Sequence, residues 1–593
     1  MHTFHIPVMG TGFTIDTPLK VARYGISSVI SLGDDKLIEK MRRYYCDLYH
    51  EPYLPIPESD VDHRALRITA YLDLIDRAVQ RQIQKLKNAA FDGESELSVY
   101  FELMSDASAL KQEYLRMLKE GEEGKRDILQ AQLRGQVRAG RIDVNIMTKA
   151  DRENSFKGEK LPREYSDAMA ALRGFAKSTL CSSVVFSAGL NPYLYTYTGE
   201  FEDFYADNNG NLKKKVTLKV SDFRSASIQA KMLAKKGIWI SEYRIESGLN
   251  CGGHAFPTTG HLLGPILEEF KTKKRALVES LFPYYQAALL EKGRPSPKTP
   301  YPVLVTAQGG VGTAAEHQFL LRNYELDSVG WGSPFLLVPE ATAVDEETLQ
   351  KLAAADDKDI YLSHASPLGV PFYNLRSSAS EETRRQRIEA GKPGSPCLSK
   401  YLAFNTEFGE SLCVSSSQYQ AKKLAVLEKS GLSGAELKKE RDHVLEKACI
   451  CRNLADGALL KYGIPDEKKV LTPAVCPGPN LAYFSRIFSL KEMIQHIYGV
   501  KNVLNEALSR PHFLVNELRL YINFLQSYVS DIDTKASKKE ADYFNEFKEN
   551  LLAGIEFYKE KVGDLKEEAE ISQKKFISDL FLLGSELQQL SLP

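Results

Sequence analysis

The sequence has no long apolar run, no excess of one charge and no leader-like start. No stretch reaches the roughly 18 consecutive apolar residues that a transmembrane helix needs. The opening MHTFHIPVMGTGF lacks a basic region followed by an apolar stretch and a small-residue cleavage site. Lys and Arg number 77 against 78 Asp and Glu, a net charge of −1, which argues against nucleic acid or an anionic membrane surface as a partner. We therefore expect a cytoplasmic protein with a small or neutral substrate.

Cysteine is also scarce. The 593 residues contain eight cysteines, too few for a disulfide scaffold, and a reducing compartment would keep them as thiols or metal ligands. Five of the eight fall between residues 397 and 476. The chain is long enough for two or more domains, or for one large domain with insertions.

Short β-type runs recur along the first part of the chain, most of them followed by a helical pattern. The runs are FHIPVMG, ISSVISLG, RIDVNIMT, SSVVFSAG, VTLKVSD, WISEYRIES, VLVTAQGG and SVGWGSPFLL. Strands that alternate with helices predict parallel βα units, and eight of them predict a closed (β/α)₈ TIM barrel over about residues 1–360. An open doubly wound α/β sheet is the alternative on strand count alone.

Two helical blocks add to this pattern. A long insertion at about 56–138 contains RALRITAYLDLIDRAVQRQIQKLK, with apolar residues at helical spacing, and predicts a lid or an interface. The block at 501–593 predicts a helical hairpin or small bundle, packed on the barrel or on a second subunit. A homodimer through the helical regions is therefore a hypothesis. Residues 361–500 form a cysteine-containing segment between barrel and bundle.

The active site of such a barrel lies at the C-terminal ends of the strands, so the residues that end each run are the candidates. In the first run, Gly10 and Gly12 would let a flat ring lie close to the backbone. The other cofactor-binding candidates are Met9, Thr11, Asn145, Ser187, Gly189, Ser221 and Gly253, with Met147, Ala188, Val220 and Gly252 beside them.

Glycine-rich turns follow the seventh and eighth runs. TAQGGVGTAAEHQFLL opens a helix, and GWGSPF ends the eighth run. Loops after strands seven and eight, with exposed N–H groups at a helix N-terminus, are the usual phosphate site of these barrels. The candidates are Gly309, Gly310, Gly332 and Ser333, and ordinary tight turns are the alternative. A phosphate held here and a flat ring over the glycines of the first run predict FMN, which would supply the redox chemistry.

The sixth run leads to GLNCGGHAFPTTGH, residues 248–261, in which two glycines precede His254. Glycine pairs let a ligand approach the chain closely. An imidazole titrates at about pH 6.5 and could take a proton from a substrate carbon while hydride moves to the flavin. We predict His254 as the catalytic base, with a surface loop histidine as the alternative. Glu246 would orient that ring or be a solvated carboxylate, and Cys251 would be a packed or a reactive thiol. His261, His317 and His364 are expected to be structural or solvated.

GLNCGGHAF, followed by TAQGGVG and then GWGSPF, resembles the nitronate monooxygenase family of FMN barrels. This family, formerly called 2-nitropropane dioxygenases, also includes flavin-dependent enoyl-acyl-carrier-protein reductases. The likeness covers most of residues 1–345 apart from the insertion, although the first run lacks the family's proline-rich opening. The resemblance implies a flavin-dependent oxidoreductase, and the family's catalytic histidine falls on His254.

The next segments, SHASPLGVPFYNLRSS, SPCLSKYLAFNTEFGESLC, KACICRNLADGALLKYG and CPGPNLAYFSRIFSLKEMIQHIYG, resemble one branch of that family. This branch, the acyl-carrier-protein dehydrogenase/isomerase of unsaturated fatty-acid synthesis, carries a [4Fe–4S] cluster beside its FMN. By position the resemblance implies the ligands Cys397, Cys413, Cys449 and Cys451, and it places PGPN (477–480) near the flavin. Cys-x-Cys strains ligation of one cluster, so Cys476 competes for the fourth place. Structural zinc or unliganded thiols are the alternatives.

Three functions are open from the sequence. The first is an FMN oxidoreductase, with a [4Fe–4S] cluster, that removes or adds hydrogen next to a carbonyl. Its substrate would be an acyl thioester or related enoyl compound, which a carrier protein could hold, and His254 would be its acid and base. The second is a nitronate monooxygenase that uses O₂ and needs no cluster. The third is a non-catalytic flavin-binding scaffold whose helical blocks bind a partner.

Overall fold

The structure is a computed structural model. It describes residues 2–93, 95–148, 151–187, 189–253, 259–396, 400, 402–450, 453–466, 470–531, 537–565 and 570–592. Several residues singled out in the sequence lie outside these ranges: Ala188, His254, Cys397 and Cys451.

Eight parallel strands form a closed barrel at the centre of the molecule. Around the barrel their order is β1, β10, β9, β8, β7, β6, β3 and β2, and β2 pairs with β1 to close the ring. The strands are β1 (Phe4–Ile6), β2 (Ser27–Ser31), β3 (Ile142–Ile146), β6 (Ser182–Phe186), β7 (Lys214–Val220), β8 (Ile240–Glu246), β9 (Leu304–Gln308) and β10 (Ser328–Gly330). Each lies within one of the eight predicted runs or overlaps it, so the barrel is confirmed and the open sheet was wrong.

Paired charges fill the interior of the barrel. Arg244 on β8 lies 3.4 Å from Asp143 on β3, and because these strands are not neighbours the contact crosses the interior. Arg244 also pairs with Glu242 at 2.7 Å, and Thr306 donates a hydrogen bond to Glu242. Buried ions are tolerated where they are paired in this way. Side chains alternate along a strand, so Glu246, two residues beyond Arg244, also faces inward at the mouth of the barrel.

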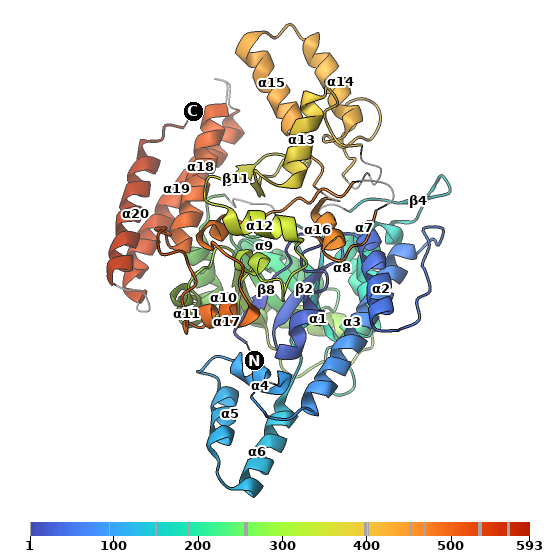
Figure 1. The fold of residues 1–593 in the computed structure, drawn as a ribbon. Helices are drawn as coiled ribbons and strands as arrows, with labels where there is room; N and C mark the ends of the chain where they lie inside the picture. The colour runs from blue at the N-terminus through green and yellow to red at the C-terminus, as the bar shows by residue number, and fades with distance from the viewer. Residues whose placement is uncertain are drawn as a thin grey trace.

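Helices surround the barrel (Figure 1). Those that follow the strands are α1 (Thr17–Val21), α2 (Asp35–Leu48), α7 (Asp167–Ala176), α8 (Pro192–Thr198), α9 (Phe223–Ala234), α10 (Leu263–Glu291), α11 (Ala314–Asn323) and α12 (Glu346–Ala354). A short hairpin, β4 (Ser155–Phe156) and β5 (Glu159–Lys160), lies between β3 and α7.

The predicted insertion is helical, but it does not cover the active-site face. Its first helix, α3 (His63–Lys87), packs in the outer ring against α2 and α7. The others are α4 (Glu96–Glu102), α5 (Ala109–Lys119) and α6 (Glu123–Gln136). Tyr100 of α4 donates to the carbonyl of Arg138 and packs beside Gly25, and both positions precede strands. α4–α6 therefore project from the N-terminal end of the barrel (Figure 1). The lid expectation was wrong for α4–α6, whereas Arg64 at the start of α3 lines a cavity at the C-terminal end of the barrel. An interface role stays a prediction.

The segment after the barrel covers the opposite end. It contains β11 (Ile360–Ser363), β12 (Phe372–Leu375), α13 (Ala379–Glu389), α14 (Ser417–Glu428), α15 (Gly434–Glu446), α16 (Asn453–Lys461) and α17 (Leu490–Ile497). α14 and α15 project above this end in Figure 1. α16 lies directly on the end of the first strand, because a Cβ on Gly12 would come within 2.7 Å of the Leu454 carbonyl oxygen.

Three helices complete the chain: α18 (Phe513–Asp531), α19 (Lys538–Lys561) and α20 (Glu570–Gln589). They pack together and lie against α10 on one side of the barrel (Figure 1). The Tyr558 hydroxyl of α19 accepts a hydrogen bond from the Gly264 amide of α10 at 3.1 Å. The predicted small bundle on the barrel is confirmed, and α18–α20 are called the C-terminal bundle below.

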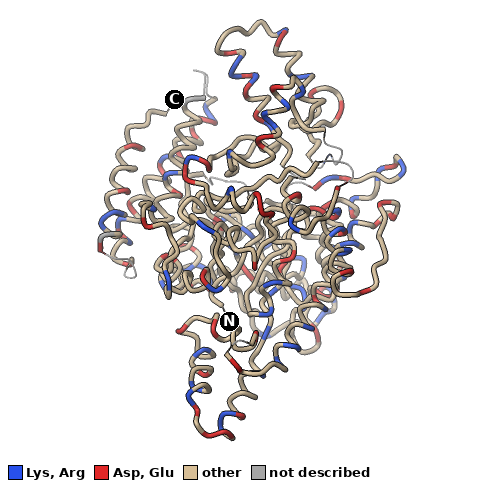
Figure 2. Tube along the Cα trace, in the orientation of Figure 1, with Lys and Arg blue, Asp and Glu red and all other residues tan. Residues whose placement is uncertain are grey.

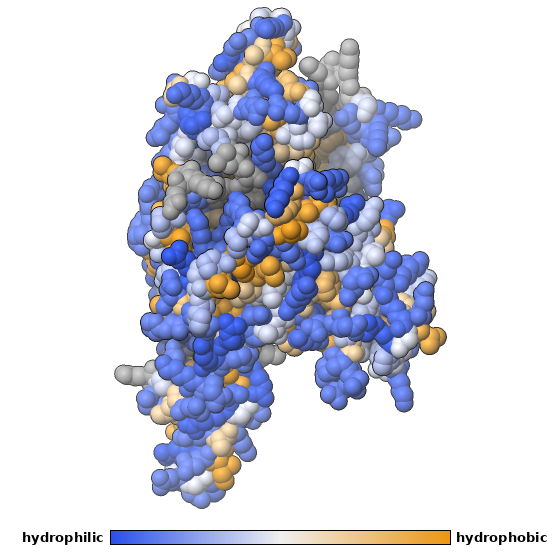
Figure 3. All heavy atoms as spheres, turned by 90° about the vertical axis from the view of Figure 1, so that its right-hand side faces the viewer, coloured by the Kyte–Doolittle hydropathy of each residue, from blue (hydrophilic) through white to orange (hydrophobic). Residues whose placement is uncertain are grey.

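The surface carries both charge signs throughout. Lys and Arg are interspersed with Asp and Glu along the trace in Figure 2. Most of the face in Figure 3 is hydrophilic, with apolar side chains gathered in a few patches. In the part of the chain that the structure describes, no helix is long and apolar enough to cross a membrane.

Candidate active site

One cavity lies at the C-terminal end of the barrel, under the segment that follows it, and is called the main cavity below because of this position. Its volume is about 160 Å³. Met147, at the end of β3, lines this cavity and is 46% exposed. From the barrel come Thr11, Leu32, Gly33, Ile146, Met147, Gly252 and Gly253, and from the covering segment Ser366, Leu368, Phe372, Leu402, Ile450, Leu454 and Cys476.

A second, much smaller cavity of about 10 Å³ lies beside the first. It brings together the four residues predicted to bind phosphate. Its lining includes Gly309, Gly310, Gly332 and Ser333, together with Pro7, Leu249, Asn250, Cys251, Gln308, Val311, Gly330 and Asn480. Residues 249–251 line the small cavity and residues 252–253 line the large one. The Gly-Gly loop thus separates a narrow polar space from a wider apolar one.

The helix that follows the seventh barrel strand begins with a capping box that pairs several of its backbone amides. Thr313 and Glu316 form a capping box, in which the Glu316 carboxylate accepts the Gly312 amide at 2.8 Å and the Thr313 amide at 3.2 Å. Arg510, far along the chain, pairs with the same carboxylate at 2.6 Å. The Gly312, Thr313 and Glu316 amides are therefore paired within the protein. The glycine turns beside them stay the predicted phosphate cradle.

The glycines of the first strand and of the Gly-Gly loop pack against protein. A Cβ on Gly252, which has a φ of 75°, would overlap the backbone of Met9 and Gly10, and the Gly10 amide donates to the Gly252 carbonyl at 3.3 Å. Gly10 and Gly12 lie against Leu454 and Ala455 of α16. These glycines therefore allow three chain segments to meet at the cavity edge, and the space expected above Gly10 and Gly12 is taken by α16.

The remaining predicted residues lie at strand ends but line neither cavity. The Ser187 hydroxyl donates to the Asn145 amide oxygen at 2.6 Å. Gly189 accepts a hydrogen bond from Thr148 at 3.0 Å. Met9 is fully buried, and Ser221 is half-buried just after β7.

Sequence reasoning missed an ion pair at the barrel mouth. Lys219 on β7 lies 2.8 Å from the Glu246 carboxylate on β8, and Gln308 on β9 donates to the same carboxylate at 2.9 Å. The side chains of Lys219 and Glu246 are 12% and 10% exposed, so the solvated reading of Glu246 was wrong. The signal was in the sequence: Glu242, Arg244 and Glu246 alternate along one strand.

Thr11 Oγ1, on the large cavity, is buried and has no hydrogen-bond partner among the described residues. A buried polar atom without a partner costs roughly 1–3 kcal/mol, so a polar ligand that pairs with it would stabilise the site. The Gln308 side chain, on the small cavity, is already engaged: its amide nitrogen donates to Glu246, and it also interacts with the His5 imidazole.

Two thiols meet between the cavities. Cys251 Sγ lies 3.2 Å from the Cys476 carbonyl oxygen, and Cys476 Sγ lies 3.5 Å from that of Gly253. Burial raises the pKa of both thiols, that of Cys476 to about 11, so both are neutral near pH 7. Cys251 is therefore a packed thiol. In the PGPN segment, Asn480 donates to the Val311 carbonyl at 2.8 Å and covers the small cavity.

The four cysteines predicted as cluster ligands belong to the segment that follows the barrel. Cys413 is buried and Cys449 is half-buried. Ser395, two residues before Cys397, exchanges backbone hydrogen bonds with Ser415 and Ser417. Gln420 of α14 donates to the Lys447 carbonyl at 2.8 Å, so the chain segments around three of the predicted ligands converge. Among residues described by the structure, no three His, Cys, Asp or Glu side chains are grouped as a metal site.

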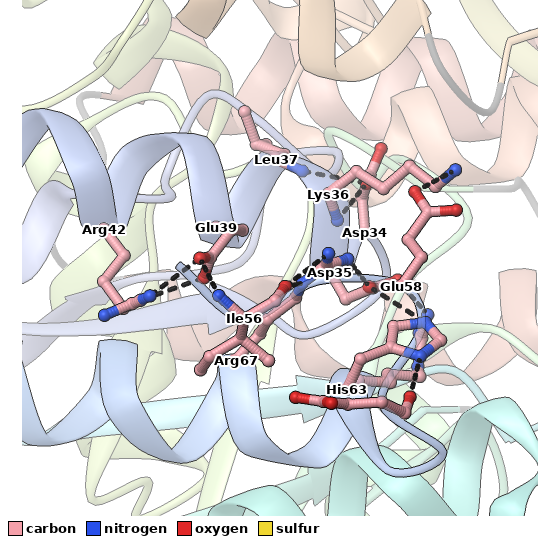
Figure 4. Close-up of polar contacts among 12 residues, drawn as sticks. Asp34, Asp35, Lys36, Leu37, Glu39, Arg42, Ile56, Glu58, His63 and Arg67 are labelled. Atoms are coloured by element: carbon pink, nitrogen blue, oxygen red, sulfur yellow. Dashed lines mark hydrogen bonds and ion pairs between the residues drawn. The ribbon is translucent and has the colours of Figure 1, made fainter. Parts of the chain in front are cut away.

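Charged residues that the sequence analysis did not single out border the main cavity at the start of α2. Asp35 pairs with Arg64 at 2.9 Å and with Arg67 at 2.8 Å. Lys36 pairs with Glu58 at 2.8 Å, as Figure 4 shows for this side of the site. Arg64 and Asp167 line both the main cavity and a polar cavity of about 390 Å³. The site is therefore apolar within and polar at this border.

The three other histidines singled out in the sequence, His261, His317 and His364, are structural or solvated, as expected. His317 is fully buried and accepts the indole N–H of Trp331 at 3.2 Å, and burial lowers its pKa to about 3. His261 and His364 are exposed.

Comparison with known proteins gives distant likenesses. No protein-family model and no curated protein matches the chain. The solved structure of FabK from Thermotoga maritima is similar over 69% of this chain and 86% of its own, at 15% identity and a TM-score of 0.30. That of nitroalkane oxidase from Streptomyces ansochromogenes is similar over 78% and 95%, at 9% identity and a TM-score of 0.30. The assignment of the barrel fold rests on the strand order of this structure, and these likenesses carry no argument about activity.

Proposed function

We propose that the chain is an FMN-dependent oxidoreductase. The observation that carries the proposal is the pair of cavities on the two sides of residues 249–253, one small and glycine-lined, the other larger and apolar. FMN has matching chemistry, with a phosphate at one end and a flat ring at the other. The ring also has a polar edge, which suits the unpaired Thr11 Oγ1 on the larger cavity. When bound, FMN supplies the hydride chemistry.

The chemistry of the lining residues suits this group, and the small cavity, at about 10 Å³, would have to widen to admit the phosphate. Gly309 and Gly310 have φ values of 118° and 82°, conformations that turn successive amides toward one side of the chain. The Ser333 hydroxyl adds a donor on the facing turn. These three residues and Gly332 would hold the phosphate, while Gly253 and Thr11 would border the ring. His254 follows Gly253 directly in the chain and would take a proton from the substrate or return one.

The apolar wall favours an acyl thioester or related enoyl substrate. Leu32, Ile146, Leu368 and Phe372 line the main cavity with few polar neighbours, and burying a chain of methylenes there would contribute about 0.8 kcal/mol for each. The polar part of the substrate would lie toward Arg64 and Asp167, where the polar cavity begins. A nitronate is small and charged and would gain little from this wall. The same proposal includes a substrate that is attached to a carrier protein.

We further propose a [4Fe–4S] cluster in the segment above the barrel. Its support is the convergence of the chain around Cys397, Cys413 and Cys449, described above, with Cys451 as the fourth ligand. Soft thiolates favour iron–sulfur sites. Cys476 hydrogen-bonds instead to the Gly-Gly loop, which argues against it as a ligand.

The test is anaerobic purification followed by quantification of flavin, iron and sulfide in one sample. We expect about one FMN per chain. An acyl thioester should bleach the flavin by reducing it, or an enoyl thioester should reoxidise the reduced flavin. His254→Ala should abolish that reaction and keep the FMN. A protein that takes up no FMN on reconstitution contradicts the proposal. Yellow, iron-free protein with nitronate-dependent O₂ uptake would favour nitronate oxidation.

A further inference from the structure

Both ends of the loop that carries His254 lie against the C-terminal bundle. At the first end, a Cβ on Gly248 would come within 2.9 Å of the Tyr521 ring and 3.0 Å of Leu520, both on α18. At the second end, Asn550 of α19 donates its side-chain amide to the Thr259 carbonyl at 2.7 Å. Segments some 270 to 290 residues apart in the chain thus meet at this loop.

The second end is held by close backbone packing as well. A Cβ on Gly260, which has a φ of 77°, would overlap the Phe547 carbonyl oxygen of α19. On the same helix, a Cβ on Gly554 would come within 2.6 Å of Leu262. Glycines on both partners therefore let the loop and α19 approach each other more closely than side chains would allow.

The hydrogen bond at the start of α10 replaces a missing helix cap. The N-cap residue is Leu262, which has no side-chain cap, yet the first amides of a helix need acceptors. Glu517 of α18 supplies one: its carboxylate accepts the Leu263 amide at 2.8 Å. Glu517 is 1% exposed. A residue 254 positions away in sequence therefore fixes where α10 begins, and with it where the loop ends.

We propose that the C-terminal bundle positions the loop that carries the catalytic base, and that Glu517 and Asn550 are its positioning residues. The catalytic meaning of the proposal rests on the proposed function, because it needs His254 to be the base. The contacts themselves do not depend on that role: two helices remote in sequence, α18 and α19, hold both ends of one loop at the barrel mouth. These contacts are called the clamp below. A small displacement of a catalytic group can cost about a hundredfold in rate.

The test uses the full chain with Asn550→Ala, and Asn545→Ala as the matched control. Asn545 is an exposed residue of the same helix whose side chain donates only to the Ala541 carbonyl. Hydrogen exchange is followed in peptides that cover residues 249–262 and, for comparison, residues 309–313. Asn550→Ala should raise exchange several-fold in 249–262 and leave 309–313 and the melting temperature close to those of the Asn545→Ala protein. Unchanged exchange in 249–262, or an equal rise in both peptides, would overturn the clamp.

Kinetics then separates the clamp from the proposed function. With FMN content unchanged, Asn550→Ala should lower kcat for flavin reduction about tenfold or more with little change in KM, because the base and not the substrate pocket is displaced. A rise in exchange together with an unchanged kcat would contradict the catalytic role of the clamp. A rise in exchange in a chain that binds no FMN at all would support the clamp and contradict the proposed function.

Discussion

Glu316 Oε1 lies 2.6 Å from Nη1 of Arg510. Arg510 also donates to the Asn480 side chain and to the Gly310 carbonyl, each at 2.7 Å. One guanidinium thus joins the capped start of α11, the PGPN segment and the glycine-rich turn. The side chains of Arg510 and Glu316 are 7% and 1% exposed, so solvent screens their attraction little.

Arg510→Met should weaken FMN binding and lower stability. Removing one partner of a buried pair leaves the other charge unpaired, which costs about 3–5 kcal/mol, and the turn at Gly310 loses the donor that fixes it. We expect the FMN Kd, measured by quenching of flavin fluorescence, to rise at least about tenfold. The control is Arg486→Met, which removes an exposed pair with Glu492. Equal FMN affinity in the two variants would contradict this role of Arg510.

The protonation of Glu517 should make stability depend on pH. Burial raises the pKa of its carboxyl from 4.5 to about 7, so the folded state favours the protonated form. The contribution to stability is fully present below pH 4.5 and is lost as pH rises through about 7, in total about 3 kcal/mol.

Glu517→Gln removes this titration and keeps an oxygen that can accept the Leu263 amide. The variant should therefore be more stable relative to the natural chain at pH 8 than at pH 5: the difference in free energy of unfolding, variant minus natural chain, should be more positive at pH 8. Urea denaturation at the two pH values measures the difference. A constant difference across this range would show that Glu517 is ionised in the folded protein already at pH 5.

Gly252→Ala should be far more destabilising than its backbone strain alone requires. Gly252 and Gly293 have similar φ values of 75° and 64°, but a Cβ on Gly252 would overlap the Gly10 backbone, whereas nothing lies within 4 Å of a Cβ on Gly293. Gly293→Ala measures the strain, about 1 kcal/mol, and Gly252→Ala should exceed it by several kcal/mol in urea denaturation. Equal losses would mean that the Gly-Gly loop does not pack on the first strand.

Serine substitutions should distinguish the cluster ligands from Cys476. We expect Cys397→Ser, Cys413→Ser, Cys449→Ser and Cys451→Ser each to lower the iron and sulfide content of anaerobically purified protein, because each removes one thiolate. Cys476→Ser should keep the iron, as should Cys181→Ser, the exposed control. Iron lost from Cys476→Ser and kept in Cys449→Ser would exchange the roles of these two residues.

The barrel could be predicted from the sequence because each of its strands has a local sequence signal. Runs such as SSVVF are rich in β-branched residues and end in small or polar ones, and each became a strand. The phosphate turns were found for a similar reason, since their glycines stand at the ends of two such runs.

What the sequence did not reveal depends on contacts between distant residues. Glycine signals that a Cβ is excluded but not by which neighbour, so Gly12 gave no sign that α16 lies against it. The pair of Lys219 and Glu246 was not predicted, because charged side chains inside a barrel are uncommon and the pairing joins two strands. The Arg510–Glu316 and Asn550–Thr259 contacts span 194 and 291 positions, and no local pattern encodes them.

Equilibrium binding of FMN to the purified chain, with the visible spectrum recorded on the same sample, tests the central claim most directly. The account predicts saturable binding of about one FMN per chain, with flavin bands that shift on binding, and loss of this binding in Gly310→Val, where the added side chain would meet Leu249. A chain that stays colourless and unsaturated with FMN, or that binds FMN equally well as Gly310→Val, would contradict it.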